Sequence, residues 1–585
     1  MECELITDFG RLESIAREWN DLWMASPQSE VFQNFNWLRA AWKTFGKQLS
    51  LFTPVVYRGS EIIGILPLTL KDGTLQFLGS PLSDYNDVIC ADECVTEVMS
   101  AAFNALLRSQ QHWKACVMDN VAAHSRLARH LPQLQAPLRR HFCTSFRCPC
   151  STILMSPEHA KELVRKQSLR RHENVLRRLG RVDFRHIEDR ETIKRNLGTF
   201  YHQHIGRRAV VGDASHFLDE RTRRMFEMLV EELDPRNMLR FGVLTLDDRP
   251  VAYHFGFEAN GKFVFYQPAF DIDYWKSSPG EVLLRQLFLY AQESKLSEFD
   301  LTRGGETYKD RFATHVRENL TLHFNHDSGL RRQIQVGIQR ADGGMRKTLE
   351  TLRKHQPAYR IARNVALRWL GLWRRERHLM QVEGLSYVAD FIRRAIRSFV
   401  FTRNATATFS IGKHEVARYA GSLGDGLTVS LTSLSELAVV SAMDPDTCPT
   451  CREFQDRLAA GQQLYLIYQG AEPVQIWCVT TPSGQPPSCE HRAQEPMLTL
   501  EHCWTASWFR GEGLRGILQE LSGRDMNVLV SCHESAPVIQ EIRSLGLRVS
   551  HLSVCFHLLR WVRPVFVFRN GFPRAISASK NVAKL

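Results

Sequence analysis

One short pattern occurs three times in this chain and limits what the chain can fold into. Each copy is an apolar run, a polar turn that carries Gly or Asp, and a second apolar run with β-branched residues. This pattern predicts a β-hairpin, because the turn residues reverse the backbone and branched side chains favour extended conformations. The three predicted hairpins lie at Leu51–Leu70, Leu239–Glu258 and Leu464–Thr480.

The second copy continues into a longer unit. Asn260-Gly261 predicts a type I′ turn, and KFVFYQPAF after it predicts a third strand. The next segment has the period of one apolar helical face, and EFDLTRGG then predicts a last strand. The apolar helical positions are Leu283, Leu284, Leu287, Phe288 and Ala291. The predicted order is three antiparallel strands, a helix and a strand reached by a crossover.

The other two copies have similar sequels, so we predict three related α/β (α+β) units with mixed sheets. The third copy is followed by MLTLEHCWTA as a strand, FRGEGLRGILQEL as a loop and helix, and NVLVSCH as a strand. The first is followed by LQFLGSPLSDYNDVIC and a helical stretch over Val95–Leu107. The predicted parts are an N-terminal unit at 1–150, a second unit at 151–330, a basic helical linker at 331–400, a C-terminal unit at 401–570 and a flexible tail at 571–585.

Composition narrows the class of protein. With 44% hydrophobic residues the chain is too apolar to be disordered, and 14 cysteines in 585 residues are too few for a disulfide scaffold. No apolar run reaches the roughly 18 residues that a membrane span needs, and the N-terminus lacks the layout of a signal peptide. These features together predict a cytoplasmic protein.

The net charge of +12 is concentrated in one segment. Residues 331–403 carry 17 Lys and Arg against 5 Asp and Glu, so the rest of the chain is neutral on balance. Within it, Ile361, Val365, Trp369 and Leu372 recur on one helical face between arginines. The pattern fits a peripheral contact with the inner face of a membrane or with an acidic partner. A helix packed on its neighbouring unit is the favoured alternative. No DNA partner is expected, because no nucleic-acid-binding motif is present.

Ser278-Pro279-Gly280 precedes the predicted helix and has the composition of a helix start. Ser278 suits the N-cap, Pro279 suits the first helical position, and Glu281 is predicted to complete a capping box. A helix start also leaves backbone N–H groups free, so the same residues are a candidate seat for a pyrophosphate. The Glu281 carboxylate counts against this second interpretation, because it repels phosphate.

A second glycine-containing turn joins a predicted strand to a predicted helix in the C-terminal unit. In RGEGLRG, residues 510–516, the glycines let the backbone approach a ligand closely and the arginines supply charge. The candidate binding residues are Arg510, Gly511, Gly513 and Leu514. An ordinary strand-to-helix turn is the alternative.

Polar residues also gather in FDLTRGGETYKDRF, at the end of a predicted strand. They are Arg303, Glu306, Tyr308, Lys309 and Arg311. Strand ends that face a ligand cleft are where α/β proteins place their chemistry, and a polar surface loop is the alternative.

Two further polar segments have two interpretations each. In SPLSDYNDV, the residues Asp84, Tyr85 and Asp87 suit an amine or sugar ligand, and on these residues alone a turn cap is favoured. The segment 163–182 predicts a basic helical stripe, for which a solvated face is favoured over an anionic-substrate groove. Its arginines are Arg170, Arg171, Arg177 and Arg178.

The cysteines do not predict a metal site. Cys448 and Cys451 form one CxxC, and Cys148 and Cys150 form a CxC. A structural zinc site needs four ligands at matched spacing, and no second pair follows Cys451 at that spacing.

Residues of about 30–325 resemble the CelD/BcsL-type acetyltransferases, relatives of the FemAB peptidyltransferases. The resemblance rests on FQNFNWLRAAWKTFG, SPLSDYNDV, LRRHENVLRRLG and FYHQHIGRR, and most of all on FDIDYWKSSPGEVLL followed by FDLTRGGETYKDRF. It implies two tandem GNAT-type units. Residues of about 400–565 resemble one more divergent GNAT domain, through TASWFRGEGLRGILQEL and CHESAPVIQEIRSLGL. Ile542 lies near the place where GNAT enzymes often carry a tyrosine.

The resemblance implies direct transfer of an acyl group, acetyl in the simplest case, from acyl-CoA to an amine or hydroxyl. The implied acceptor is a small molecule or saccharide related to the cell envelope or to exopolysaccharide, and no metal is implied. The diphosphate of acyl-CoA would lie at Ser278, Pro279 and Gly280, and the same cofactor would contact the 510–514 turn.

The resemblance also implies roles for polar residues. An acceptor must lose a proton to a base, for which Glu306, His204 and Asp84 are candidates. The oxyanion of the intermediate must meet a donor, for which Tyr308 and Lys309 are candidates. The implied substrate-binding residues are Tyr85, Asp87, Arg207, Arg303 and Arg311.

Two alternatives remain at this point. The first is a Fem-like transfer from aminoacyl-tRNA, in which the basic stripe of segment 163–182 contacts the tRNA. The second is a non-catalytic CoA-binding or interaction module in the C-terminal unit, which the absence of the tyrosine near Ile542 favours.

Overall fold

The computed structural model describes residues 1–326 except 27, 305 and 307, and, in the C-terminal part, 401–411, 427–506 except 446, 447 and 481–496, 509, 513–521, 527–533, 538, 542, 549–558, 565–569 and 572–575. The chain divides into two compact units. The first comprises Met1–Arg207 and His216–Arg363, and the second comprises Arg208–Ser215 and Asn364–Leu585. The basic linker expected at 331–400 lies outside the described residues.

The first unit is built on two mixed or antiparallel β-sheets with helices around them. The smaller sheet has the order β1 (Glu2–Ile6), β3 (Thr53–Arg58), β4 (Glu61–Ile65) and β7 (Ile89–Cys90). The larger sheet has the order β10 (Val182–Ile187), β11 (Leu239–Leu246), β12 (Arg249–Ala259), β13 (Lys262–Phe270), β14 (Glu298–Arg303), β9 (Phe142–Leu154), β15 (His315–Phe324), β8 (Ala115–Ala122), β6 (Thr74–Phe77), β5 (Leu68–Lys71) and β2 (Ser50–Leu51). The predicted α/β class with mixed sheets is confirmed.

The order predicted for the second copy is confirmed. Strands β10 to β13 are antiparallel neighbours, and β14 then pairs in parallel with β13 after helix α11, Pro279–Glu293. Asn260 and Gly261 have φ of 51° and 73°, and the flanking residues Ala259 and Lys262 pair. Two positive φ angles in a two-residue loop define the type I′ turn.

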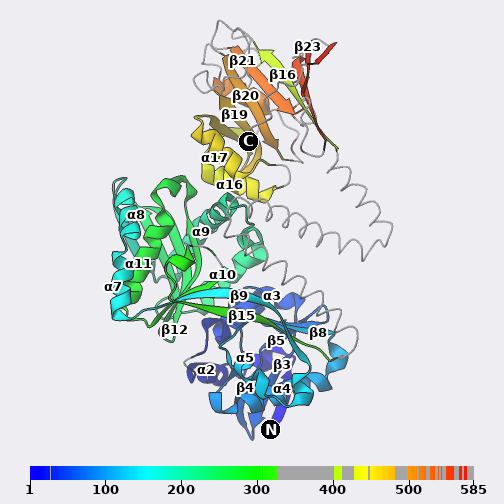
Figure 1. Cartoon of the computed structure of the whole chain (residues 1–585), viewed down its shortest axis with the longest axis vertical. Coiled ribbons are helices and arrows are strands. Elements are labelled where there is room, and N and C mark those ends of the chain that lie inside the picture. The colour runs from blue at the N-terminus through cyan, green and yellow to red at the C-terminus, as the bar shows by residue number, and fades with distance from the viewer. Residues whose placement is uncertain are drawn as a thin grey trace, which may run out of the picture. The chain divides into compact units, whose positions relative to one another are not determined.

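Helices cover both faces of strands β10 to β14 (Figure 1). On one side lie α7 (Pro157–Arg165), α8 (Gln167–Arg177) and α11, whose apolar residues pack with Phe299 and Leu301 of β14. On the other side lie α9 (Arg190–Val210) and α10 (Glu220–Glu232), where Phe200 stacks on Phe255 of β12. Because side chains alternate along a strand, Glu298, Asp300 and Thr302 lie on the face opposite to α11.

Strands β9 and β15 join the two halves of the first unit. They pair with each other along ten residue pairs, β9 also pairs with β14, and β15 also pairs with β8 (Figure 1). The boundary expected at residue 150 therefore falls inside β9.

The remaining helices of the first unit surround its N-terminal half. Val95, Val98, Met99 and Phe103 of α4 pack into one hydrophobic core with β3, β6 and β8, separate from the core under α11. The helices are α1 (Phe9–Glu13), α2 (Ala16–Met24), α3 (Phe35–Phe45), α4 (Val95–Arg108), α5 (Arg126–His130) and α6 (Ala136–Arg139).

Seven strands of the second unit, from β17 to β22 in the sheet, repeat the order of the strands from β10 to β15 in the first. Its sheet has the order β17 (Leu427–Leu431), β18 (Gln463–Gln469), β19 (Glu472–Thr480), β20 (Met497–Thr505), β21 (Asn527–His533), β16 (Phe401–Ile411), β22 (Val549–Leu558), β23 (Val565–Arg569) and β24 (Phe572–Ala575). Helix α18 (Gly513–Leu521) connects β20 to β21, which pair in parallel. Helices α16 (Leu434–Met443) and α17 (Cys451–Ala459) precede β18.

None of the described helices combines the length and the hydropathy that crossing a bilayer requires. The described residues also contain no group of three or more His, Cys, Asp or Glu side chains placed to hold a metal ion.

Candidate active site

The parallel pairing of β13 with β14 is short. It covers Lys262 to Val264 against Glu298 to Asp300, and the described ladder between the two strands ends there. Beyond this point β14 leads through Arg303 into the polar segment that ends in the short helix η8, Lys309–Arg311. The end of β14 thus brings the segment that contains Glu306 and Lys309 to the edge of the parallel pair.

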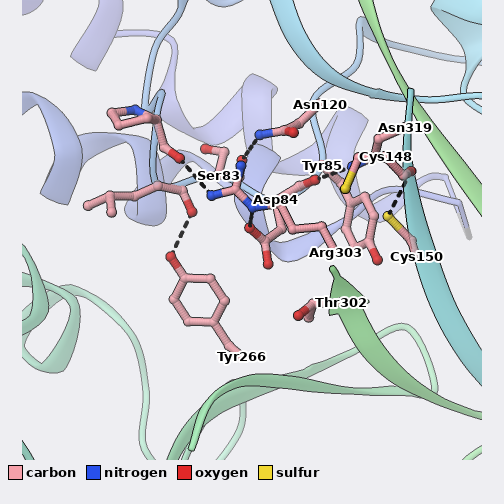
Figure 2. Close-up of polar contacts among 12 residues, drawn as sticks. Ser83, Asp84, Tyr85, Asn120, Cys148, Cys150, Tyr266, Thr302, Arg303 and Asn319 are labelled. Atoms are coloured by element: carbon pink, nitrogen blue, oxygen red, sulfur yellow. Dashed lines mark hydrogen bonds and ion pairs between the residues drawn. The ribbon is translucent and has the colours of Figure 1, made fainter. Parts of the chain in front are cut away.

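An ion pair between a partly exposed arginine and a buried carboxylate links this segment to the loop before β7. The Arg303 Nε lies 2.6 Å from the Asp84 Oδ1, and the other end of the guanidinium donates to the Pro81 carbonyl at 3.2 Å. The Asp84 side chain is 5% exposed and the Arg303 side chain 39%. Figure 2 shows this pair with Asn319, whose amide donates to the Asp84 carbonyl at 2.8 Å. The structure therefore joins two polar segments that are far apart in sequence.

Lys309 is buried and holds the segment in place. Its Nζ lies 2.9 Å from the Glu306 Oε2 and donates to the Arg303 carbonyl at 2.9 Å. The Lys309 side chain is 4% exposed and the Glu306 side chain 35%. The carboxylate of Glu306 is therefore held by a buried cation and still reaches solvent.

Tyr85 and Asp300 form a third buried contact. The Tyr85 hydroxyl donates to the Asp300 Oδ1 at 2.9 Å, and the Thr302 amide donates to the same oxygen at 2.7 Å. The hydroxyl of Tyr266 on β13 donates to the Leu82 carbonyl at 2.6 Å (Figure 2). The segment 81–85 is thus bonded to both strands of the parallel pair.

Burial shifts the pKa values of the titratable groups in this cluster, and neighbouring charges oppose these shifts. Burial raises the pKa of Asp84, while Arg303 and then Lys309 act to lower it. Burial acts to lower the pKa of Lys309, but Glu306, Tyr308 and Asp84 together outweigh it and the pKa is raised. Burial also raises the pKa of Tyr308, with Lys309 and Arg207 opposing it. Lys309 therefore stays charged at neutral pH and Tyr308 stays protonated.

The predicted capping box at Ser278 is wrong. Ser278 is the N-cap of α11, but it has the left-handed conformation (φ 52°, ψ 53°) and its side chain makes no capping hydrogen bond. An N-cap residue normally caps from an extended conformation, which directs its side chain at the helix amides. Glu281 instead lies 2.7 Å from Arg311 and 3.5 Å from His172.

The start of α11 offers few free amides. The amides of Glu281 and Val282 donate to the Ser278 carbonyl, and Pro279 has no N–H. The Gly280 amide remains as a first-turn donor. A Cβ on Gly280 would lie 2.8 Å from the Phe270 ring, so the glycine allows α11 to start against the end of β13.

His204 and Arg207 lie on α9, near the far end of β13. The His204 Nε2 lies 3.2 Å from the Gln267 Oε1, and Arg207 donates to the Pro268 carbonyl at 2.7 Å. Neither side chain has a described contact with Asp84 or Glu306. Arg207 acts on Tyr308 electrostatically, because its charge opposes the rise in the Tyr308 pKa.

Asp87 does not join the cluster. Its two carboxylate oxygens accept the Arg126 and Leu127 amides at 2.8 Å each, at the start of α5. Burial raises the pKa of Asp87 to about 6. Accepting two backbone amides is what a capping side chain does, and a turn cap is the interpretation that the sequence favours for Asp87.

The basic stripe of segment 163–182 is shorter than the predicted helix. The helical conformation is interrupted at Lys166, which separates α7 from α8, and α8 ends at Arg177. All four arginines of the stripe are exposed, and Arg177 lies 2.8 Å from Glu173 in its own helix.

The turn at 510–516 is described only from Gly513 onward, so Arg510 and Gly511 lie outside the described residues. Gly513 and Leu514 begin α18 and are buried. A Cβ on Gly513 would lie 1.8 Å from the Gln475 Oε1, so the Gln475 side chain already occupies the space beside this helix start. Ile542 is fully buried.

Sequence reasoning missed Asp300 and Tyr266. A signal was present for Asp300, because it is a charged residue between Phe299 and Leu301 inside a predicted strand. A buried charge costs free energy unless it has a partner, so such a position indicates a specific contact. The partner, Tyr85, is 215 positions away and could not be identified from the pattern.

Replacing Arg303 with Met is expected to lower the free energy of unfolding by about 3 kcal/mol, because it leaves the buried Asp84 carboxylate without its cation. Urea denaturation of the variant measures this loss. The double variant Asp84→Asn, Arg303→Met should recover at least half of it. Equal losses in Arg303→Met and in the double variant would show that the loss does not come from an uncompensated Asp84 charge.

Comparisons with known proteins identify part of the first unit. Residues 164–310 match the family Acetyltransf_6, described as "Acetyltransferase (GNAT) domain". This segment contains the start of α11, Asp300, Arg303, Glu306 and Lys309. No curated protein matches the chain.

Three solved structures are similar to this chain, each at 12% sequence identity. FemX covers 55% of this chain and 97% of its own length with a TM-score of 0.39. L-PGS from Bacillus licheniformis covers 52% and 95% with a TM-score of 0.34. A tandem GNAT protein from the clavulanic acid biosynthesis pathway covers 56% and 100% with a TM-score of 0.32. Likenesses at this level carry no argument about substrate.

Proposed function

We propose that this GNAT-type acyltransferase moves an acyl group, acetyl in the simplest case, from acyl-CoA to an amine or hydroxyl of a metabolite related to the cell envelope or exopolysaccharide. The observation that carries the proposal is the buried cluster at the end of β14. In this cluster the carboxylate of Glu306 is partly exposed, and the buried ammonium of Lys309 holds it in place. The CelD/BcsL resemblance supports the saccharide-related acceptor.

The donor would lie along β13. Its diphosphate would bind at Ser278–Gly280, where the Gly280 amide and the Arg311 guanidinium are the nearby donors. Arg311 would have to exchange the Glu281 carboxylate for a phosphate, because both compete for the same guanidinium. From Phe270 to Val264 the strand covers six residues, or about 20 Å at roughly 3.3 Å per residue. The long pantetheine arm of CoA suits a path of this kind.

Glu306 is the proposed general base. A base must be within hydrogen-bond reach of the acceptor, and Asp84 is almost fully buried, whereas the Glu306 side chain is 35% exposed. Once the acceptor is deprotonated, it attacks the thioester carbonyl. Lys309 and Tyr308 are the proposed donors to the resulting oxyanion, since both are protonated at neutral pH. The intermediate then collapses, the C–S bond breaks, and CoA leaves as the thiol with the proton that Glu306 took from the acceptor. His204 stays a second candidate base, and Arg303 a substrate-binding residue.

For the C-terminal unit we propose a non-catalytic role. Two observations support it: the Gln475 side chain beside Gly513, and the fully buried Ile542 near the position of the leaving-group tyrosine. Full-length protein should therefore bind one acyl-CoA, not two, in isothermal titration calorimetry.

The test of the proposed function uses full-length protein with acetyl-CoA, longer acyl-CoAs and uncharged tRNA in separate thermal-shift series. An acyl-CoA at 100 times its dissociation constant should stabilise the fold by about 2.7 kcal/mol. Release of free CoA thiol in the presence of an amine or saccharide acceptor measures turnover. If tRNA stabilises the protein and no acyl-CoA does, the result would favour the Fem-like alternative, in which aminoacyl-tRNA is the donor.

A further inference from the structure

Two cysteines of β9 lie in the polar cluster at the end of β14. Figure 2 shows Cys148 and Cys150 with Asp84, Tyr85 and Arg303. Cys150 pairs with Arg303 across the sheet, and its thiol acts electrostatically on Tyr85. The pKa of Arg303 is raised most strongly by Asp84, and the two thiols act in the same direction. The Cys-Pro-Cys segment, which the sequence does not predict to bind metal, therefore lies beside the candidate active site.

The two thiols share one face of the strand and contact each other. Alternate residues of a strand point to the same face, so Cys148 and Cys150 are neighbours on that face. Their side chains are hydrogen-bonded to each other, and the Cys150 Sγ also lies 3.9 Å from the Cys148 carbonyl oxygen. Proximity of this kind is the first requirement for a disulfide.

The two cysteines differ in how they can react. Cys148 is half-buried, whereas Cys150 is fully buried. The hydrogen bond with Cys148, and then burial, raise the pKa of Cys150, so the Cys150 thiol stays protonated. The thiolate is the reactive form of a cysteine, and a neighbouring cation such as Arg303 favours it. Cys148 thus has the features of an attacking thiol, and Cys150 those of a resolving thiol behind it.

We propose that Cys148 and Cys150 form a reversible dithiol switch, which a hydroperoxide closes to a disulfide and a dithiol reductant reopens. The Cys148 thiolate attacks one oxygen of the peroxide and the O–O bond breaks. Cys148 becomes a sulfenic acid, and the second oxygen leaves as water or an alcohol with the proton that Cys148 released. The Cys150 thiol then attacks the sulfenic sulfur, the S–S bond forms, and the hydroxyl leaves as water with the Cys150 proton. In total two thiols are oxidised and one peroxide is reduced.

Closing the disulfide has to shorten β9 around Pro149. Alternate Cα atoms of a strand are roughly 6.6 Å apart, near the upper end of the range of about 4.4–6.8 Å that disulfides span. Pro149 has no N–H to lose from the ladder, but its carbonyl accepts the Gly304 amide at 3.0 Å. Gly304 joins Arg303 to the segment that carries Glu306. Oxidation should therefore displace that segment.

Other described thiols offer internal comparisons. Cys90 is hydrogen-bonded to Cys94, and Cys478 to Cys503. Cys90 and Cys94 are both buried, at 1% and 7% exposed, so an oxidant reaches them less easily than it reaches Cys148. Neither pair has a described contact with the ion pair of the candidate site.

The test treats full-length protein with hydrogen peroxide, removes the excess with catalase, and alkylates the remaining thiols with iodoacetamide in urea. Trypsin cleaves after Arg147 and Lys161, so Cys148 and Cys150 lie on one peptide with no other cysteine. In reduced protein this peptide should carry two alkyl groups. After peroxide most of it should carry none and be two hydrogen atoms lighter than the dithiol, and dithiothreitol should restore the alkylated form. A peptide that keeps both alkyl groups after peroxide overturns the proposal.

Variants separate the two thiols. In Cys150→Ser, Cys148 should stop at the sulfenic acid, which dimedone traps on the same peptide. In Cys148→Ser neither the disulfide nor the trapped product should form. Cys143→Ser is the matched control, because Cys143 is a half-buried cysteine of the same strand, and it should keep the disulfide. Dimedone on Cys150 in Cys148→Ser, or loss of the disulfide in Cys143→Ser, contradicts the assignment.

The effect on the site is measured on the same samples after desalting. Peroxide should lower acyl transfer from acetyl-CoA by at least about 10-fold, since misplacing groups by about 1 Å costs up to roughly 100-fold. Dithiothreitol should restore the rate, and Cys148→Ser should be insensitive to peroxide. Full activity of the oxidised protein would overturn the switch. The peptide masses stand apart from the proposed function, because a reduced protein without any acyl transfer rejects that function and leaves the disulfide measurable.

Discussion

Replacing Glu306 with Gln is expected to lower kcat/KM for acyl transfer by at least about 100-fold, because a positioned general base contributes roughly 10² to 10⁴ in rate. The amide keeps a hydrogen-bond acceptor for Lys309, which the structure places 2.9 Å from Glu306. The fold should therefore survive, while the acceptor loses the group that takes its proton. Thiol release from acetyl-CoA measures the effect, with Tm recorded on the same sample.

A matched control is available in the same segment. Asp310 is exposed and lies one residue beyond Lys309. Asp310→Asn should keep the wild-type rate, since it removes an acidic charge that has no described contact with the cluster. Full activity of Glu306→Gln would remove Glu306 from the mechanism and leave His204 as the next candidate.

Replacing Asp300 with Asn is expected to change how stability depends on pH. The ordinary pKa of an aspartate is 3.8 and that of Asp300 is raised to about 7, mainly by burial. Between these two values the native state holds a proton that the unfolded state has released. The free energy of unfolding therefore falls as pH rises from 3.8 to about 7, and is constant above it. The loss amounts to about 4 kcal/mol at roughly 1.4 kcal/mol per pH unit.

The variant has no such proton to lose. The difference in unfolding free energy between Asp300→Asn and the wild type should therefore grow by up to about 4 kcal/mol between pH 4 and pH 8. Urea denaturation series at several pH values measure it. At pH 8 the variant should be the more stable protein. A constant difference across the pH range would show that Asp300 is ionised throughout.

Local patterns were sufficient to predict the elements around the site. The Asn260-Gly261 turn, strand β13, helix α11 and strand β14 follow from turn chemistry and from apolar periodicity, both of which act over a few residues. The polar residues at the end of β14 were also predicted as a group. These are the features that short-range sterics and burial determine.

Contacts over long separations were not predictable. The Asp84–Arg303 and Tyr85–Asp300 contacts join residues more than 200 positions apart, and nothing in either segment specifies the other. The capping box failed for a related reason. Glu281 has the right spacing to cap Ser278, but Arg311 and His172 compete for its carboxylate from other elements. A spacing rule cannot include competitors that only the tertiary fold brings close.

The shared strands β9 and β15 have a consequence for how the protein loses its structure. A chain cut at residue 150 would sever β9 and separate β15 from β8 and from most of β9, so neither fragment keeps the larger sheet complete. The two halves should therefore melt in one cooperative step. Local unfolding in either half should therefore also disturb the buried contacts of Lys309 at the end of β14.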